Sequence, residues 1–352
     1  MQANSYASPA ARGGNREDLR DVLTILEPES FPFTSMVRKT DEAAATLGEV
    51  LGDTLRAPRI SGTREGQSNG KGNNKAAKRQ RFGVYQHRVM DEYGTTDVQQ
   101  AISKRGGTAA VANEFAYGKA KTLRELKRDM EAICCSNQDH AGGSDAEMQT
   151  RGCFKWLQPS ATASFTAPAV PAEFLPLATS ATGTTTVTAL KTIGAAATTA
   201  NLTEDDLNYI LIALQRQHGG SREYQGIFGD AIVNVVDHFT RTNSSTTNVR
   251  YQVNDNADKH EISMTVKVFQ SSAGRVNILP TQFNFWDSTT NLPDPSAGLI
   301  LKLDLWYLDS LEGLHAVDRD DDEDAGGVSG YAKAMFANCC KMPRGNGKIT
   351  QS

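Results

Sequence analysis

The chain has 352 residues, enough for one large domain or two smaller ones that bury a hydrophobic core. Its 37 Lys+Arg against 41 Asp+Glu give a net charge of −4, which excludes nucleic-acid binding by the whole surface and leaves only a local role of that kind. No apolar run is long enough to span a bilayer, and the N-terminal stretch MQANSYASPAARGG lacks the apolar core of a signal peptide.

Two elements are expected before residue 45. Asn15 can cap a helix that carries leucines on one face and ends at Pro28. The following run, PESFPFTSMVRKT, is predicted to be extended and apolar, with a second proline at Pro32. An arm of this kind has little core of its own, so we expect it to lie on another surface.

A long excursion covers residues 46–100. Two extended limbs, GEVLGDTLRAPRI and RFGVYQHRVMDEYGTTDVQQ, flank a glycine- and asparagine-rich middle at 62–74. A lone hairpin of this length is marginal in water, so it should rest on a surface of its own chain or of a neighbour.

The tip of this excursion is basic and contains no acidic residue. Three interpretations are open: a charged loop tip kept soluble, a contact with an acidic surface of another subunit, or nucleic-acid binding. The last would favour interleaved aromatic residues for base stacking, and only Phe82 and Tyr85 follow the tip. The basic residues are Lys71, Lys75, Lys78, Arg79 and Arg81.

The strongest helix signal follows Gly106-Gly107, where Thr108 can cap a periodic stretch that runs to about Cys135. Charged residues lie mostly off the apolar face and include the i,i+4 pairs Lys121/Glu125 and Lys127/Glu131. At 1.5 Å per residue the helix is roughly 40 Å long, so we expect a girder across one layer of the protein. The apolar face comprises Val111, Phe115, Leu123, Leu126, Met130 and Ile133.

The second half of the chain begins with a segment rich in alanine and threonine, 159–200, whose composition suits a small β insertion or a partly ordered surface loop. A compact unit follows near Leu202. Thr203 and Asp206 have capping-box spacing, Asp230 can cap a further helix, and EYQGIFG, ISMTVKVFQ, RVNILP and GLILKLDLWYL read as strands. This order of helices mixed with strands predicts an α+β fold.

No motif supports catalysis or a cofactor. The histidines sit in unrelated contexts, and HExxH, G-x-S-x-G and P-loop patterns are missing. The acidic run at 318–324 fails as an EF-hand, because Glu323 stands where glycine is needed and Ser329 where glutamate is needed. The five cysteines form no zinc pattern and are expected to be small buried hydrophobes in a chain made in a reducing cytoplasm.

The order of apolar arm, long hairpin, girder helix and α+β unit resembles the major capsid proteins of tailed bacteriophages, which share the Hong Kong ninety-seven type fold. EDLRDVLTILEPESFPFTSMV looks like the N-terminal arm of one capsid family in that class, and GEVLGDTLRAPR and VQQAISKRGG resemble the bases of its extended loop. FAYGKAKTLRELKRDMEAICCSNQ is similar to its spine helix, and KAMFANCCKMPRGNGKI to its last strand and tail.

The resemblance implies a name for each part of the chain. Residues 159–200 depart from the family pattern and are taken as an insertion, exposed on the capsid surface. The other parts are the N-terminal arm at 1–45, the extended loop at 46–100, the peripheral domain with the spine helix at 101–158, the axial domain at 201–328, and a strand returning to the peripheral domain at 329–352.

The resemblance also implies a non-enzymatic shell subunit, present in the virion after assembly in the host cytoplasm, that binds no cofactor, metal or membrane. Its partners would be other copies in pentamers and hexamers, packaged double-stranded DNA, and portal, scaffold or decoration proteins. The alternatives are an encapsulin-like compartment or a DNA-binding protein that uses the basic tip. We expect the tip to meet an acidic surface on a neighbour, with these residues as candidates: Asp318, Asp320, Asp321, Asp322, Glu323 and Asp324.

Overall fold

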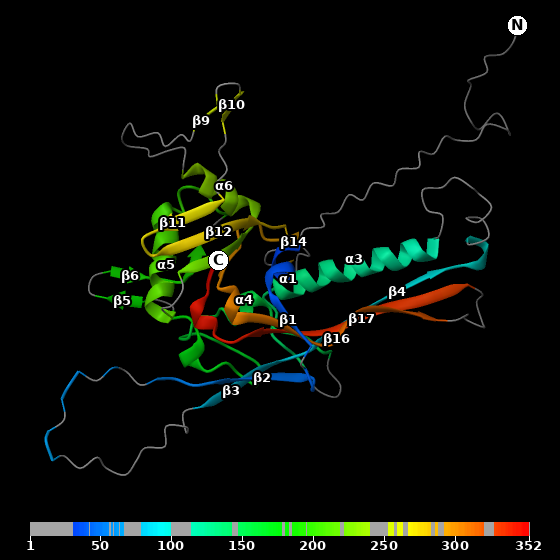
Figure 1. Cartoon of the computed structure of the whole chain (residues 1–352), viewed down its shortest axis with the longest axis horizontal. Helices are drawn as coiled ribbons and strands as arrows, with labels where there is room; N and C mark the ends of the chain where they lie inside the picture. Colours follow the sequence, from blue (N-terminus) through cyan, green and yellow to red (C-terminus); the bar gives the residue numbers. More distant parts are fainter. Residues whose placement is uncertain are drawn as a thin grey trace, which may run out of the picture. The chain divides into compact units, whose positions relative to one another are not determined.

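The computed structural model (Figure 1) describes residues 31–351 with gaps at 42, 56–57, 59, 63, 67–78, 100–113, 143–146, 178–179, 183–184, 195, 219–221, 240–252, 257–258, 263–266, 283–285, 288–291 and 320–326. The helix predicted at 15–28 lies outside these residues. The chain divides into a smaller unit, Met1–Glu29, Met90–Glu125 and His315–Ala332, and a larger unit, Ser30–Val89, Leu126–Leu314 and Lys333–Ser352. No helix in the described part of the chain is long and apolar enough to cross a membrane.

A six-stranded mixed sheet forms the core of the larger unit. The strands β12, β8, β18 and β7 run in one direction and β15 runs in the other: β8 is parallel to β12 but antiparallel to β15, and β18 is antiparallel to β15 but parallel to β7. Mixed directions agree with the predicted α+β class. In sheet order the strands are β11 (Val268–Ser271), β12 (Gly274–Pro280), β8 (Glu223–Phe228), β15 (Gly298–Leu301), β18 (Gly347–Gln351) and β7 (Leu190–Ile193).

Two amphipathic helices pack on this sheet, α5 (Glu204–His218) and α6 (Asp230–His238). The predicted capping box of α5 is confirmed: the Thr203 amide donates to Asp206 Oδ2 at 2.9 Å, and the Asp206 amide donates to Thr203 Oγ1 at 3.3 Å. The cap of α6 is Gly229 and not Asp230. The shared core contains Leu207, Ile210, Leu211, Leu214, Ile232, Val235, Val236, Tyr224, Phe228, Val276, Ile278, Ile300 and Ile349.

A four-stranded sheet has the order β1 (Arg38–Thr40), β16 (Trp306–Arg319), β17 (Val328–Cys340) and β4 (His87–Thr95). The position of β4 differs from the prediction, which gave this stretch to the returning limb of the hairpin. The hairpin itself pairs only β2 (Leu47–Gly52) with β3 (Gln80–Tyr85). Val89 and Tyr93 are buried, and the rings of His87 and Tyr93 contact those of Phe336 and Phe115, contacts that a free limb would lack.

The remaining elements are short. Three further antiparallel pairs are β5 (Ser180–Thr182) with β6 (Thr185–Val187), β9 (Val253–Asn256) with β10 (Lys259–Ile262), and β13 (Trp286–Asp287) with β14 (Leu292–Pro293). The short helices are α4 (Cys153–Trp156), η3 (Ala172–Phe174), η4 (Leu303–Leu305) and η5 (Pro343–Gly345).

The alanine- and threonine-rich segment contributes to the core of its own subunit. Its strand β7 closes one edge of the six-stranded sheet by pairing with β18. The expectation of an exposed insertion is therefore wrong for the buried positions of this segment, whereas many of its other described residues are exposed. The buried side chains are Val170, Phe174, Leu175, Val187, Ala189 and Ile193.

The five cysteines are free and buried, as predicted. Burial raises the pKa of each thiol, so these groups stay protonated at neutral pH. They serve as small hydrophobic side chains in the packing of the larger unit.

Helix α3 is described over Glu114–Cys134, while the predicted cap Thr108 and Val111 lie outside the described residues. The predicted Lys121–Glu125 pair forms, with 3.6 Å between Nζ and Oε1. On the predicted apolar face, Leu126 is buried. The other described residues of that face are half-buried in the single subunit: Phe115, Leu123, Met130 and Ile133.

Glu131 differs from its prediction as an exposed residue that pairs with Lys127. It is fully buried, and its two carboxylate oxygens accept the amide hydrogens of Phe33 and Thr34, each at 2.8 Å. These amides lie in the first turn of α1 (Pro32–Met36), which no nearby side chain caps. The stretch predicted to be extended is thus a short helix, capped by a carboxylate 98 positions further along the chain.

Removing this carboxylate should destabilise the subunit. In Glu131→Ala two buried amides lose their acceptor, so we expect the free energy of unfolding to fall by about 3 kcal/mol. Glu131→Gln should lose less, because its amide oxygen still accepts one bond. Urea denaturation of the isolated subunit measures this. The control is Glu125→Ala on the same helix, which should cost no more than about 0.5 kcal/mol. Equal losses at both positions would contradict the cap.

Candidate functional site

The extended hairpin is the part of the chain in which the candidate assembly residues gather. Its paired region runs from Leu47 opposite Tyr85 to Gly52 opposite Gln80. Phe82 and Val84 on β3 are buried, so the inner part of the hairpin is packed against the rest of the larger unit. Beyond Gly52 and Gln80 the described residues of the loop have no strand partner.

Large apolar side chains are exposed along the first limb of the loop. Leu51 is 61% exposed, Leu55 99% and Ile60 100%. Single exposed leucines are ordinary, but a succession of them on one projecting segment is a feature of surfaces that bind another protein. This limb is therefore suited to burial against a second molecule.

Of the basic tip residues, only Arg79 and Arg81 lie in the described part of the chain. Lys71, Lys75 and Lys78 lie outside the described residues. Arg81 forms an ion pair across the hairpin, with 2.7 Å between Nη2 and Glu49 Oε2, and Arg79 a looser one, with 3.9 Å between Nε and Asp53 Oδ2. Both arginine side chains are more than half exposed, so each pair contributes little stability and leaves guanidinium surface accessible to a partner.

Of the acidic candidates, only Asp318 lies within the described residues. It belongs to the smaller unit, where Lys119 Nζ donates to both carboxylate oxygens at 2.8 and 2.9 Å and the Tyr93 hydroxyl donates to Oδ1 at 2.5 Å. The bond from Lys119 lowers the pKa of Asp318. Asp318 is thus engaged within its own chain, while residues 320–324 lie outside the described part.

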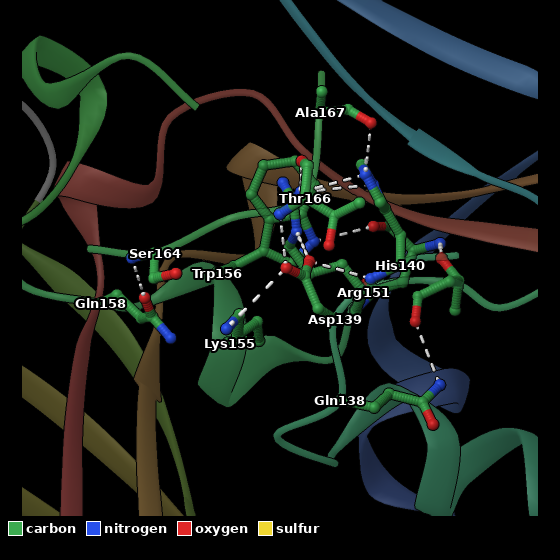
Figure 2. A network of polar contacts seen from close by, with 12 residues as sticks. Gln138, Asp139, His140, Arg151, Lys155, Trp156, Gln158, Ser164, Thr166 and Ala167 are labelled. Carbon is green, nitrogen blue, oxygen red and sulfur yellow. Dashed lines mark hydrogen bonds and ion pairs between the residues drawn. The ribbon is translucent and has the colours of Figure 1, made fainter. Parts of the chain in front are cut away.

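A buried polar network, which we call the Arg151 network, lies in the larger unit (Figure 2). The Arg151 side chain is fully buried, and its Nε donates to Asp139 Oδ1 at 2.8 Å. Its guanidinium carbon lies 4.7 Å from the ring centroid of Trp156 and 4.6 Å from that of Phe165. The charge is therefore neutralised at one edge by Asp139 and lies over two aromatic rings.

His140 connects the Arg151 network to residues 166–167 (Figure 2). Arg151 Nη2 lies 3.2 Å from His140 Nδ1, and His140 Nε2 lies 3.2 Å from the carbonyl oxygen of Ala167. These partners assign the neutral tautomer, in which Nδ1 accepts and Nε2–H donates. Burial and the nearby Arg151 charge lower the pKa of His140, which keeps the ring neutral.

Thr150 joins the same network to the four-stranded sheet. Its amide donates to His87 Nδ1 on β4 at 3.2 Å, and its Oγ1 accepts the amide hydrogen of Asn338 on β17 at 3.0 Å. Its carbonyl oxygen accepts from Gln138 Nε2 at 3.0 Å. Residues 150–151 therefore tie several chain segments together, which sequence analysis missed because no local pattern links these positions.

These clusters are built to hold segments together. The described residues contain no group of three or more His, Cys, Asp or Glu side chains that could hold a metal ion. The Asp139–Arg151 and Glu131 contacts each join a buried charged group to another segment, although Arg151 Nη1 is buried without a hydrogen-bond partner. The geometry supports positioning and rigidity.

His87 should make the subunit sensitive to acid. Burial lowers its pKa to about 4 from an ordinary value of 6.5. Below pH 6.5 the His87 imidazole is protonated in the unfolded chain, whereas in the folded chain it stays neutral down to about pH 4. The free energy of unfolding therefore falls as the pH falls. Between pH 7 and 4.5 this group should contribute a loss of about 2.5 kcal/mol. Urea denaturation measures the free energy of unfolding at both pH values. The decrease between pH 7 and 4.5 should be smaller in His87→Gln by the contribution of His87. The same pH dependence in both proteins would contradict this assignment.

Comparison with protein families finds a match that extends over residues 4–350, to the family described as SU10 major capsid protein. A comparison with curated proteins finds no match.

Solved structures that match this fold include the capsids of a cyanophage and of a GTA particle. The cyanophage A-1(L) capsid matches with a TM-score of 0.63 and 9% identity, covering 96% of each chain. The capsid of a native GTA particle matches with a TM-score of 0.58 and 9% identity, covering 99% of each chain. Gordonia phage Cozz matches with a TM-score of 0.53 and 11% identity, covering 100% of this chain and 98% of the other.

The capsid fold predicted from the sequence is thereby confirmed. Because the family match spans nearly the whole chain, the chain belongs to the SU10 major capsid protein family and is a structural protein of a phage head, where copies of it associate in the capsid shell.

Proposed function

We propose that the chain assembles through pentamers and hexamers into an icosahedral head that encloses double-stranded DNA. The observation that carries this proposal is the first limb of the extended loop, where Leu51, Leu55 and Ile60 are exposed in the single subunit. A chain of this family that presents such a limb has a ready means of covering a neighbouring copy.

The contact is head-to-tail, since the limb of one copy covers a different surface of the next. Contacts of this type generate closed rings when the rotation closes. Burying three leucine- or isoleucine-sized side chains contributes about 5 kcal/mol. One such contact barely offsets the estimated loss of translational and rotational freedom, about 4–15 kcal/mol. Closed rings and shells add stability, because each copy then covers a neighbour with its own loop and is itself covered by the loop of another copy.

The parts of the chain take the roles that the resemblance implies. Residues 1–45 act as an arm and 46–100, except for strand β4 in the four-stranded sheet, as the extended loop, while 101–158 and 329–352 form the peripheral domain and 201–328 the axial domain. Residues 159–200 contribute strand β7 to the six-stranded sheet of the subunit. The chain has no catalytic step in this scheme, and a net charge of −4 keeps repulsion between copies low.

The further partners are packaged DNA on the inner face and portal, scaffold or decoration proteins, with assembly in the host cytoplasm. An encapsulin-like compartment is not favoured, because the family match is to a phage capsid protein. Negative-stain microscopy of the expressed chain tests the proposal: polyhedral particles or rings support it. Monomers that bind free DNA with a steep salt dependence would support the DNA-binding alternative instead.

Charge on the exposed apolar limb should block assembly without unfolding the subunit. Leu55→Glu and Ile60→Glu change side chains that are 99% and 100% exposed, so the free energy of unfolding should change by no more than about 0.5 kcal/mol. Light scattering and microscopy should show loss of particles, and the conservative control Leu55→Met should assemble normally. Normal particles from the glutamate variants would rule out burial of this limb between copies.

Reversal of the basic tip tests its proposed contact with a neighbour. The triple variant Lys78→Glu, Arg79→Glu and Arg81→Glu should impair assembly while circular dichroism shows a folded subunit, because an acidic partner surface would repel it. A matched triple variant that keeps the charges, Lys78→Arg with Arg79→Lys and Arg81→Lys, should form particles. Normal shells from the reversed variant would show that the tip charge has no such role.

A further inference from the structure

The buried foot of the extended hairpin is held between two aromatic side chains from other segments. Phe82 on β3 is fully buried, with its ring centroid 6.3 Å from Trp156 in α4 and 5.3 Å from Phe174 in η3. Trp156 is itself fully buried and Phe174 nearly so. Phe174 belongs to the alanine- and threonine-rich segment, whose composition suggests a surface insertion.

The row of rings continues past Trp156 into the Arg151 network. The guanidinium of Arg151 lies over the rings of both Trp156 and Phe165, and it donates a 2.8 Å hydrogen bond to Asp139. The order along the row is Phe165, Arg151, Trp156, Phe82 and Phe174. Both ends of the row come from the segment at 165–174, so this segment brackets the foot of the hairpin.

Polar contacts fix the same segment to the hairpin and to the C-terminal region. Gln80 Nε2 on β3 donates to Glu173 Oε2 at 3.0 Å, and Arg344 Nη1 donates to the Glu173 carbonyl oxygen at 3.2 Å. The segment is therefore attached on one side to the hairpin strand that it packs against and on the other to η5.

The opposite strand of the hairpin also contacts Phe174. A Cβ atom placed on Gly52 would lie 2.4–3.0 Å from three atoms at the outer edge of the Phe174 ring. Only glycine therefore allows this approach. Gly52 and Gln80 form the last pair of the hairpin, so the contacts with residues 171–175 lie where the loop leaves its paired region.

We propose that residues 171–175 form a clamp that fixes the direction in which the extended loop leaves the subunit, with Phe174 as its positioning residue. The clamp rests on the proposed function, because a fixed loop direction is what would deliver Leu55 and Ile60 to the same place on every neighbour. A loosened clamp would leave the subunit folded but let the loop point in several directions, so that particles lose their uniform size.

The direction of the loop can be measured on the isolated full-length subunit. Spin labels on Leu55→Cys and Tyr209→Cys, both exposed and both in the larger unit, report the distance between the loop and α5, while the native cysteines are buried. We expect one narrow distance distribution, which Phe174→Ala should broaden. An unchanged distribution in folded Phe174→Ala would overturn the clamp.

A second variant tests the same contact without removing buried apolar surface. Gly52→Ala should broaden or shift the distribution, because its methyl group meets the Phe174 ring, whereas Gly62→Ala, which meets nothing within 4 Å, should leave it unchanged. Leucine lacks the outer ring atoms, so adding Phe174→Leu to Gly52→Ala should restore the narrow distribution. Failure of this rescue, or an equal effect of Gly62→Ala, would overturn the contact.

Particle imaging separates the clamp from the proposed function. Under the clamp, Phe174→Ala and Gly52→Ala should yield particles of mixed size or open sheets, while Gly62→Ala yields uniform particles. Uniform particles from both clamp variants would overturn the role in shell geometry. If the wild-type chain forms no particles at all, the proposed function fails, and the distances in the isolated subunit still decide whether the clamp exists.

Discussion

The packing of Phe82 against Trp156 and Phe174 is the interaction on which the role of the extended loop in assembly depends. On the inner side of this contact Phe82 and Val84 are buried, and on the outer side Leu55 and Ile60 are almost wholly exposed. In the described part of the loop the two strands pair only as far as Gly52 and Gln80, so no strand pairing covers Leu55 and Ile60. The exposed apolar side chains of the loop are available to another copy of the chain. The buried end of the hairpin, at Phe82, determines the direction of the loop and so which copy it contacts.

Contacts of buried charged side chains make the part of the subunit that holds the hairpin rigid. The side chains of Arg151 and Glu131 are withdrawn from water, and each is hydrogen-bonded to another segment: Arg151 Nε to Asp139, and the Glu131 carboxylate to the amides of Phe33 and Thr34. Breaking such a contact is costly because it leaves an unpaired buried group, so each contact fixes the relative positions of its segments. The subunit can therefore be a stable folded body before assembly, while its exposed limb stays available for neighbours.

Local patterns in the sequence predicted the elements that local interactions form. The cap of α5 by Thr203 and Asp206, strand β8, the girder helix α3 and the buried cysteines follow from spacing and composition. The family followed from the resemblance of longer segments, and the match over residues 4–350 confirms it. What could not be predicted depends on distant partners: α1 forms because Glu131 caps it, and Phe174 gains its role only when Phe82 and Gly52 are brought beside it.

Cryo-electron microscopy of particles formed by the full-length chain tests the central claim most directly. The account predicts closed shells in which Leu55 and Ile60, 99% and 100% exposed in the single subunit, are buried against a neighbouring copy and every loop leaves its subunit in the same direction. Shells in which these two side chains remain in contact with solvent, or in which the loop folds back on its own subunit, would contradict it.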